Sequence, residues 1–466
     1  MTSSSQTISP DAPTLTQRRI LFFWIPLAAS WLLMGSEQPF ANAMIARLSD
    51  AQRMIAALGI VSSLSITIES PVIMLLSTST ALARSRQNYL MLRRFTLHLI
   101  IATTFIHFLL SWTPLFDVVV RGWMGVPESI VEPIRLGMRI MIFWSAAIAW
   151  RRFKQGIMIR YGMTRQIGQG TILRLGVSAG TALLLAWWGG VPGVAVGAYA
   201  LSVGVIIEAI YTHWIAGDLI REKFGVEQPT STAAPISYGE LVKFHSPLAA
   251  SSLLFLLTQP LVSAALSRVP NPEVALAAWP VTAGVLFITR APALALPEVI
   301  IALIDEDRKT SGAGTPTQGK YTSAIYKRVM ETSFAQKSPL RNFSVLVGIG
   351  CALVLALVSF TPASHFYFRT LIGVSEDLAS IAVIGCQIGI LLPVIMGYQS
   401  WLRGLLTSKR ATLPMTLAMV INLFTMAVTL IVGVALRISG VPLAAFALTL
   451  SSLAETILLW IASKKS

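Results

Sequence analysis

The chain has 466 residues, of which 54% are hydrophobic and 12% are charged, with a formal net charge of +15. Soluble domains carry about a quarter charged residues, so this composition excludes an ordinary soluble protein and predicts a polytopic membrane protein. The sequence contains no GxxxxGK[ST], HExxH, CxxC or GxSxG motif, which argues against P-loop ATP hydrolysis and the common hydrolase sites. An enzyme is therefore not predicted.

Apolar runs of about 20 residues, the length that a helix needs to cross a bilayer, recur along the whole chain. The fold class is therefore predicted to be all-α, with twelve transmembrane helices. In chain order, a polar N-terminus (1–19) is followed by spans at 20–45, 54–80, 95–118, 130–150, 166–188, 192–216, 244–267, 276–303, 342–362, 378–400, 411–436 and 441–462.

The basic residues are distributed unevenly between these spans. Of the 36 Lys and Arg residues, 26 fall in the termini and the even-numbered loops, and six fall in the odd-numbered loops. Because cytoplasmic loops carry the excess of Lys and Arg, both termini are predicted to be cytoplasmic, in a multi-pass protein of the inner (plasma) membrane. The positive charge is thus explained by topology, and no nucleic-acid partner is predicted.

The first spans of the two halves repeat one another. Segment 26–47 and segment 247–268 are offset by 221 residues and are identical at eleven of 22 positions. The register continues without a gap to Pro71 and Pro292. Self-similarity of this kind predicts a duplicated structure of six helices plus six.

Later in each half the offset becomes 248, so that GVPE (125–128) matches GVSE (373–376). The difference is an insertion of 27 residues in the loop after the eighth span. The predicted organisation is a polar cytoplasmic N-terminus (1–19), an N-lobe (20–216, helices 1–6), a cytoplasmic linker (217–243) and a C-lobe (244–462, helices 7–12) with a cytoplasmic insertion at about 304–341.

Two six-helix halves that enter the membrane from the same side are predicted to be related by an axis along the membrane normal, with a substrate site between them near mid-bilayer. This arrangement favours transport by alternating access. A non-transporting membrane scaffold is the alternative, because duplication alone can give a stable bundle. An intramembrane enzyme is a further alternative, although no DDxxD or His-bearing acidic cluster occurs. No cofactor is predicted apart from H⁺ or Na⁺ as a coupling ion.

A carboxylate and a guanidinium occupy equivalent places in the two halves. Glu69, in the stretch SLSITIESPVIMLL, corresponds to Arg290 at the offset of 221, and both lie near the middle of apolar spans. A charge at that depth costs about 2.5–3.5 kcal/mol on insertion scales unless it is paired or hydrated. We therefore predict that Glu69 and Arg290 face each other across the cavity, as a static ion pair or as a substrate-binding pair.

Other arginines are predicted inside the first half. Arg135 and Arg139 are four residues apart and share one face of the fourth helix, and Arg174 lies in the fifth helix, where the second half has Asn422. A guanidinium stays charged and its fork suits carboxylate or phosphate, so a convergent set predicts an anion-binding site. The alternative is internal neutralisation by Glu69, Glu128, Glu132 or Glu208.

Glu37 lies in the first helix, just before a proline and five residues before Asn42. An intramembrane carboxylate beside a proline kink is suited to bind H⁺ or Na⁺ and to change the helix geometry, so Glu37 and Asn42 are predicted as ion-coupling residues. The alternative is a carboxylate capped by neighbouring amides without a role in transport. Glu208 and Glu455, at roughly matching places in helices 6 and 12, are interpreted as structural or vestibule groups.

Two six-helix halves, an acidic first helix with a proline, a basic loop between helices 4 and 5 and a GVPG segment before helix 6 resemble the multidrug/oligosaccharidyl-lipid/polysaccharide flippase superfamily, whose best-known branch is the MATE-type exporters. Segment 150–168, WRRFKQGIMIRYGMTRQIG, is similar to the progressive-ankylosis-like branch, which is associated with export of pyrophosphate, citrate or nucleotide-like anions. The resemblance implies that Glu37 couples transport to H⁺ or Na⁺, at a position where Asp is usual. Lipid-linked precursor flippases of the superfamily use cavity arginines for pyrophosphate.

The predicted function is a secondary active transporter, an exporter or flippase of the antiporter type, for small organic or phosphorylated anions coupled to H⁺ or Na⁺. The alternatives within transport are export of cationic drugs, bound by the glutamates, and flipping of a lipid-linked precursor. A monomer in the lipid bilayer is predicted, with a small-molecule substrate as its partner.

Overall fold

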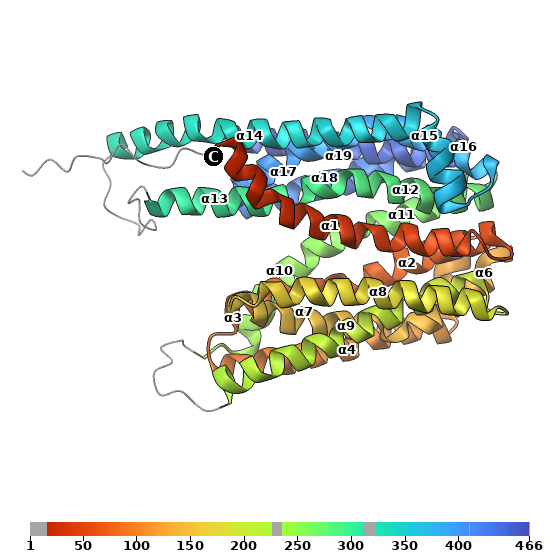
Figure 1. The fold of residues 1–466 in the computed structure, drawn as a ribbon, viewed down its shortest axis with the longest axis horizontal. Coiled ribbons are helices and arrows are strands. Elements are labelled where there is room, and N and C mark those ends of the chain that lie inside the picture. Colours follow the sequence, from red (N-terminus) through yellow and green to blue (C-terminus); the bar gives the residue numbers. More distant parts are fainter. Residues whose placement is uncertain (1–15, 226–234, 311–322, 410, 466) are drawn as a thin grey trace, which may run out of the picture.

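The computed structural model describes residues 16–225, 235–310, 323–409 and 411–465. Every element in these ranges is a helix, and the helices form two elongated bundles that lie side by side (Figure 1). The bundles meet at one end, here called the closed end, which contains η1 (Val118–Trp123) and η3 (Phe366–Ile372). They diverge toward the open end, where α1 begins at Gln17 and α7 ends at Arg160 (Figure 1).

The two halves contain the same series of elements. The first half contains α1 (Gln17–Ile45), α2 (Ala51–Ile73), α3 (Leu75–Leu82), α4 (Arg86–Trp112), α5 (Leu115–Asp117), η1, α6 (Glu128–Ile140), η2 (Met141–Phe143), α7 (Trp144–Arg160), α8 (Thr164–Trp188) and α9 (Gly193–Phe224). The second half contains α10 (Tyr238–Leu256), α11 (Thr258–Leu266), α12 (Pro272–Leu294), α13 (Leu296–Thr310), α14 (Ser323–Phe360), α15 (Ala363–His365), η3, α16 (Glu376–Ile388), η4 (Gly389–Leu391), α17 (Leu392–Ser408), α18 (Thr412–Ala435) and α19 (Gly440–Lys465).

Eleven helical segments of the described chain are long and apolar enough to cross a membrane. The remaining predicted span, 130–150, is the α6–η2–α7 segment, which carries eight charged residues and therefore has a low hydropathy. It is also longer than predicted, because α7 continues to Arg160 where the sequence analysis expected a loop. The all-α architecture and its duplicated plan are confirmed.

The predicted segments outside the membrane are described only in part. The N-terminal residues 1–15, the linker residues 226–234 and the insertion residues 311–322 lie outside the described residues. On either side of that last range the chain is helical, with α13 ending at Thr310 and α14 beginning at Ser323.

The helix breaks follow the sequence repeat. α2 gives way to α3 at Met74, and α12 gives way to α13 at Ala295, three residues after Pro71 and Pro292 in each case. A proline inside a helix removes one backbone hydrogen bond and crowds the preceding turn, which explains why both helices break there. The π-helices η1 and η3 and the short 3₁₀ helices η2 and η4 likewise begin 248 residues apart.

The first helix of each half crosses to the opposite bundle. Figure 1 shows α1 beginning on the second bundle and ending on the first, and α10 doing the reverse. At the open end, the indole N–H of Trp24 donates to the carbonyl of Pro292 at 2.8 Å, and His245 Nε2 lies 2.9 Å from the carbonyl of Pro71. Because that carbonyl can only accept, His245 Nε2 is the donor. The predicted lobe boundaries, which give each first helix to one lobe, do not capture this exchange.

A second reciprocal pair of contacts lies at the closed end. Arg47, directly after α1, donates to the carbonyls of Ile372 and Leu371 in η3, each at 2.9 Å. Arg268, directly after α11, donates to the carbonyl of Met124 at 2.7 Å, just beyond η1. Carbonyls at a helix C-terminus lack a partner within the helix, so a guanidinium that reaches them satisfies them. We call these contacts the arginine clasps; they join the halves where the bundles meet.

Glycines with a positive φ leave room for both clasps. A Cβ added to Gly125 would lie 3.4 Å from the guanidinium carbon of Arg268, and one added to Gly373 would lie 3.3 Å from Nη1 of Arg47. The φ angles of these glycines are +66° and +87°, which other residues rarely adopt. The GVPE and GVSE segments noted in the sequence therefore build the acceptor side of each clasp.

Candidate functional site

A buried carboxylate, Glu208 on α9, organises the centre of the first bundle. Arg151 of α7 donates to one of its oxygens, and Gln155 of the same helix donates to the other at 3.2 Å. Arg174 of α8 approaches it at 3.6 Å. Glu208 is fully buried, and its partners come from two other helices. Buried charges are tolerated when they are paired and hydrogen-bonded in this way, so Glu208 holds α7, α8 and α9 together.

Arg174 also connects this cluster to α1. Its Nη2 lies 3.3 Å from Oε2 of Glu37, and the hydroxyl of Ser178, one turn further along α8, donates to Oε1 of Glu37 at 3.1 Å. The predicted coupling residue is therefore neutralised by a fixed cation in this conformation. Asn42, five residues after Glu37, is 1% exposed, and neither its Oδ1 nor its Nδ2 has a hydrogen-bond partner among the described residues.

The second bundle repeats the cluster with a different charge. Glu455 of α19 accepts from Arg403 of α17, and the amide of Asn422 on α18 donates to its other oxygen at 2.9 Å. At the offset of 248, Arg403 corresponds to Gln155, and Asn422 corresponds to Arg174. Glu455 thus has one cationic partner where Glu208 has two. Asn422 lies inside this structural cluster, and the interpretation of Glu208 and Glu455 as structural groups agrees with these contacts.

Glu69 and Arg290 do not form the expected pair. Glu69 is buried and accepts a hydrogen bond from the indole N–H of Trp144 on α7, within its own bundle. Arg290 Nε donates to the carbonyl of Leu286, one turn earlier on α12, at 2.8 Å. No ion pair joins the two within the described residues. Equivalent positions in a repeat share a backbone register, but each side chain follows its own helix face, which for Glu69 is directed toward α7.

The structure does not bring Arg135, Arg139 and Arg174 onto one wall. Arg135 is paired with Asp117 at 2.8 Å and with Glu132 at 3.1 Å, near the closed end. Arg139 donates to the carbonyl of Ser111 at 3.2 Å, and its guanidinium lies over the ring of Trp112. Both side chains therefore contact the end of α4 and the α5 segment, whereas Arg174 contacts α1 and α9.

The structure adds Arg152 to the central charged groups. Its Nε is buried without a hydrogen-bond partner, and no carboxylate of the described chain lies within ion-pair distance of it. Glu69, Glu208, Arg151 and Arg174 are the charged groups that act on it electrostatically. The sequence analysis placed Arg151 and Arg152 in a loop because the apolar run ends near residue 150. The continued helical spacing of apolar residues to Ile159 is the signal that could have placed them inside the bundle.

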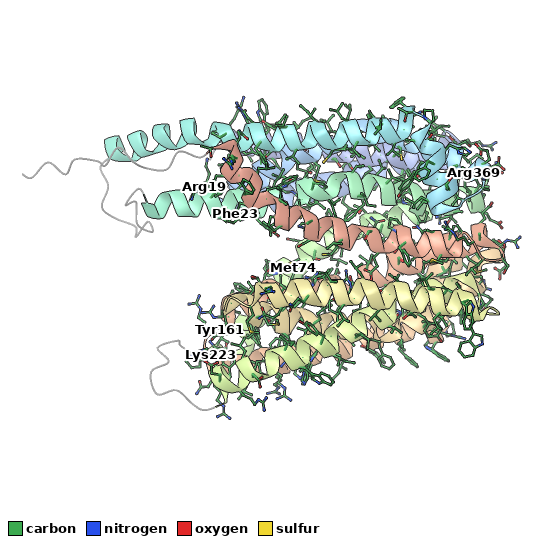
Figure 2. The ribbon with its side chains drawn as sticks, viewed as in Figure 1. Arg19, Phe23, Met74, Tyr161, Lys223 and Arg369 are labelled. Carbon is green, nitrogen blue, oxygen red and sulfur yellow. The ribbon has the colours of Figure 1, made fainter. Side chains whose placement is uncertain are left out.

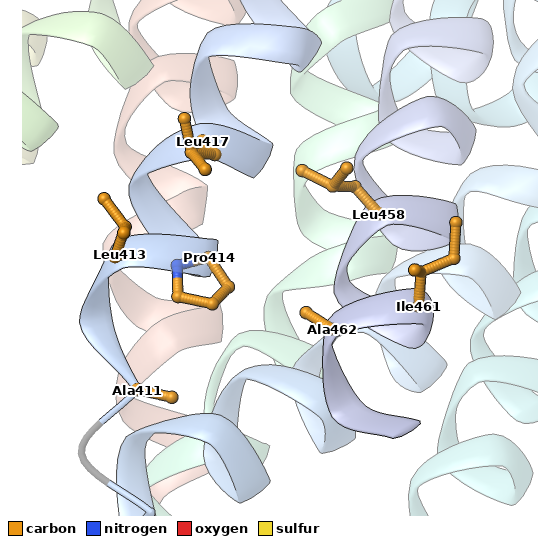
Figure 3. A pocket seen from close by; sticks show the side chains of 7 residues that line it. All are labelled: Ala411, Leu413, Pro414, Leu417, Leu458, Ile461 and Ala462. Atoms are coloured by element: carbon orange, nitrogen blue, oxygen red, sulfur yellow. The ribbon is translucent and has the colours of Figure 1, made fainter. Parts of the chain in front are cut away.

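An apolar recess lies far from these charges. It has a volume of about 380 Å³ and opens between α18 and α19 near the open end of the second bundle (Figure 3). Its lining consists of Ala411, Leu413, Pro414, Leu417, Leu458, Ile461 and Ala462. The recess presents aliphatic side chains on helices with lipid-length apolar runs, so it offers no charged group to a polar substrate.

Neither a protein-family profile nor a curated protein matches the sequence. Solved structures do match over nearly the whole chain. An inward-facing multidrug resistance MATE family transporter of the MOP superfamily has a TM-score of 0.66 at 13% identity and covers 92% of this chain and 94% of its own.

A MOP superfamily transporter from Pyrococcus furiosus, described as having a binding pocket of reverse polarity, has a TM-score of 0.64 at 13% identity, with coverage of 96% and 95%. The lipid II flippase MurJ, in an inward closed conformation, has a TM-score of 0.65 at 12% identity, with coverage of 96% and 87%. These likenesses concern the fold, and the resemblance to the progressive-ankylosis-like branch stays a prediction. By its fold, the chain is a member of the multidrug/oligosaccharidyl-lipid/polysaccharide (MOP) flippase superfamily.

Proposed function

We propose that this protein is a secondary active transporter that moves small organic or phosphorylated anions by alternating access, driven by H⁺ or Na⁺. The observation that carries the anion assignment is a pair of guanidiniums, Arg152 in the first half and Arg290 in the second, that have no carboxylate partner among the described residues. Burying a charge without a counter-charge is costly, so such groups are expected to meet an anion during the transport cycle.

The other central arginines are already engaged. Arg151 and Arg403 are bound by buried glutamates of their own bundles, and Arg174 is shared between Glu37 and Glu208. A cationic substrate would need a free carboxylate instead, and Glu69, bound by an indole, is the candidate for that alternative. The P. furiosus structure is described as having a pocket of reverse polarity, so pocket charge varies among proteins of this fold.

Glu37 and Asn42 are proposed as the coupling-ion site. In the present conformation Arg174 supplies the positive charge beside Glu37, and the carbonyl and amide of Asn42 are left without partners. H⁺ or Na⁺ at Glu37 would compete with Arg174 for the same carboxylate. Binding of the ion would then release Arg174 toward Glu208 and change the contact between α1 and α8.

The open end is proposed to face the cytoplasm. Figure 2 places Arg19, Tyr161 and Lys223 at this end and Arg369 at the opposite end. The termini and the even-numbered loops, which hold most of the basic residues, lie at the open end, as the positive-inside rule requires.

Replacing the two unpartnered arginines tests the anion assignment. Arg290→Gln and Arg152→Gln are each expected to lower the uptake of a multivalent anion, such as citrate or pyrophosphate, by about tenfold in proteoliposomes, because charge-assisted hydrogen bonds to the substrate are lost. Arg290→Lys is expected to recover part of the activity, since an ammonium keeps the charge and loses the fork. Arg94→Gln, on the exposed side of α4, is the matched control.

The same assay separates the alternatives. Uptake of an organic cation that survives both arginine substitutions and is lost in Glu69→Gln would replace the anion assignment with a cationic drug exporter. Translocation of a lipid-linked pyrophosphate, with no soluble anion transported, would assign the arginines to a lipid flippase. Absence of any flux in the intact protein would favour the membrane scaffold.

A further inference from the structure

A buried lysine on α7 has no anionic partner. Lys154 is 4% exposed, and its ammonium lies 4.9 Å from the ring centroid of Trp150, 5.6 Å from that of Phe153 and 5.8 Å from that of Tyr89. These rings stabilise the cation through their π faces. An ammonium also has three N–H donors, and within the described residues neither an acceptor nor a carboxylate is in contact with them. Lys154 therefore lacks a counter-charge within the protein.

Two further donors from other helices surround this lysine. Arg93 of α4 acts electrostatically on Lys154, and both act on His213 of α9. The indole N–H of Trp150 donates to Nδ1 of His213 at 3.1 Å. Since an indole nitrogen can only donate, Nδ1 is the acceptor and Nε2 of the neutral ring carries the proton. His213 thus offers an N–H donor beside two cations.

The acidic residues of α9 near this group are bound elsewhere. Glu208 is occupied by Arg151, and Asp218 is paired with Arg221. Arg93 and His213 are exposed, so the group is accessible from the outer surface of the first bundle. An anion that satisfies Lys154, Arg93 and His213 must therefore come from outside the described protein residues.

The depth of the group indicates where that anion resides. Lys154 lies six residues before the end of α7, and Arg93 lies seven residues after the start of α4. At a rise of 1.5 Å per residue, both lie about 10 Å from the open end of their helices. Tyr161, which follows α7 directly, lies at that end in Figure 2. Trp214, next to His213, is 75% exposed, as expected of an interfacial aromatic residue.

We propose that Lys154, Arg93 and His213 form a binding site for the phosphate headgroup of an anionic lipid in the leaflet at the open end. Basic pockets between helices on the cytoplasmic side are suited to bind such headgroups, because the phosphate supplies both charge and acceptor oxygens. The site is separate from the central cluster and from Arg290, and it does not depend on the substrate of transport. Its occupant would tie α4, α7 and α9 together where the bundle is widest.

Lipid binding by the intact protein tests this site. The protein in a neutral detergent is titrated with short-chain phosphatidylglycerol or phosphatidylcholine, and retained lipids are counted by native mass spectrometry. Wild type is expected to retain phosphatidylglycerol preferentially. Lys154→Met and Arg93→Gln are each expected to weaken that binding by about fivefold. Arg94→Gln, the adjacent exposed arginine, is expected to bind within about twofold of wild type. Lys154→Met keeps the length and apolar stem of the side chain, and Arg93→Gln provides a second variant at an exposed position should the first not fold.

Three results would overturn the proposal. The first is equal retention of both lipids by wild type, which would show that only the acyl chains are bound. The second is unchanged phosphatidylglycerol binding in folded Lys154→Met and Arg93→Gln. The third is full displacement of the lipid by millimolar glycerol phosphate or inorganic phosphate, which would assign the site to a soluble phosphate instead of a headgroup.

Discussion

Replacing Arg47 and Arg268 together by glutamine is expected to shift the protein out of the conformation described above, in which the bundles meet at the closed end. Each arginine clasp consists of charged hydrogen bonds between the halves, to η3 in one case and to the end of η1 in the other. A hydrogen bond to a charged group contributes about 1.5–3 kcal/mol. Because separation of the halves at this end breaks both clasps, we expect a change of about tenfold in the population ratio for each arginine, and about 100-fold for the two together.

Distances between spin labels at the closed end of the two halves measure this shift in proteoliposomes. Arg369→Gln is the matched control, because Arg369 lies at the same end but contacts Val374 and Glu376 of its own half, at 2.9 and 3.1 Å. If the double variant kept the wild-type distance distribution while Arg369→Gln changed it, the arginine clasps would have no part in holding the halves together. Gly125→Ala and Gly373→Ala are expected to act in the same direction as the double variant, since each would strain a left-handed backbone and crowd the guanidinium.

The duplication could be predicted because it is a property of the chain itself. Residues that set the backbone, such as Pro71 and Pro292, produce the same break wherever the same register recurs, and the offset of 221 places both breaks correctly. The identity of Arg47 with Arg268 was visible for the same reason. Their contacts were not, because each clasp joins an arginine of one half to a carbonyl of the other, and a repeat alignment compares halves without showing how they dock.

The candidate site was harder to predict than the fold. Matching Glu69 with Arg290 correctly identified two buried charges at equivalent places, but the direction of a side chain depends on which neighbouring helix covers that face. For Glu69 this neighbour is α7, which supplies Trp144. The length of α7 was also underestimated, because hydropathy treats charged residues as an end of the span. Arg151 and Arg152 were therefore assigned to a loop, although Glu208 compensates Arg151 inside the bundle.

The arginines show how far composition can lead. A convergent set of guanidiniums was a sound reason to predict an anion site, yet internal neutralisation, the stated alternative, accounts for the contacts of Arg135 and Arg174. Only the distances to carboxylates distinguish an arginine that is engaged from one that is available. By that criterion Arg152 and Arg290 carry the anion proposal, and the substrate-binding roles of Arg135, Arg139, Arg174, Glu69 and Asn422 stay predictions.

Glu37→Gln is expected to abolish the dependence of transport on the driving ion while leaving substrate binding largely intact. The amide keeps the size of the side chain and can still accept from Ser178, but it can neither bind a proton nor neutralise Na⁺. Arg174 would then be held by Glu208 alone, 3.6 Å away, and would no longer exchange with the ion. The measurement is uptake of labelled anion into proteoliposomes with an imposed pH or Na⁺ gradient, compared with uptake driven by the anion gradient alone.

In wild type, the ion gradient is expected to concentrate the anion beyond its own equilibrium, whereas in Glu37→Gln accumulation should stop at the level set by the anion gradient. Glu37→Asp restores the charge on a shorter side chain and should recover coupling in part. Glu132→Gln, whose carboxylate pairs with Arg135 near the closed end, is the control and should retain full coupling. Persistence of gradient-driven accumulation in folded Glu37→Gln would move the coupling role to another buried carboxylate. Glu69 would be the first to test, because it is held by an indole and has no ion-pair partner within the described residues.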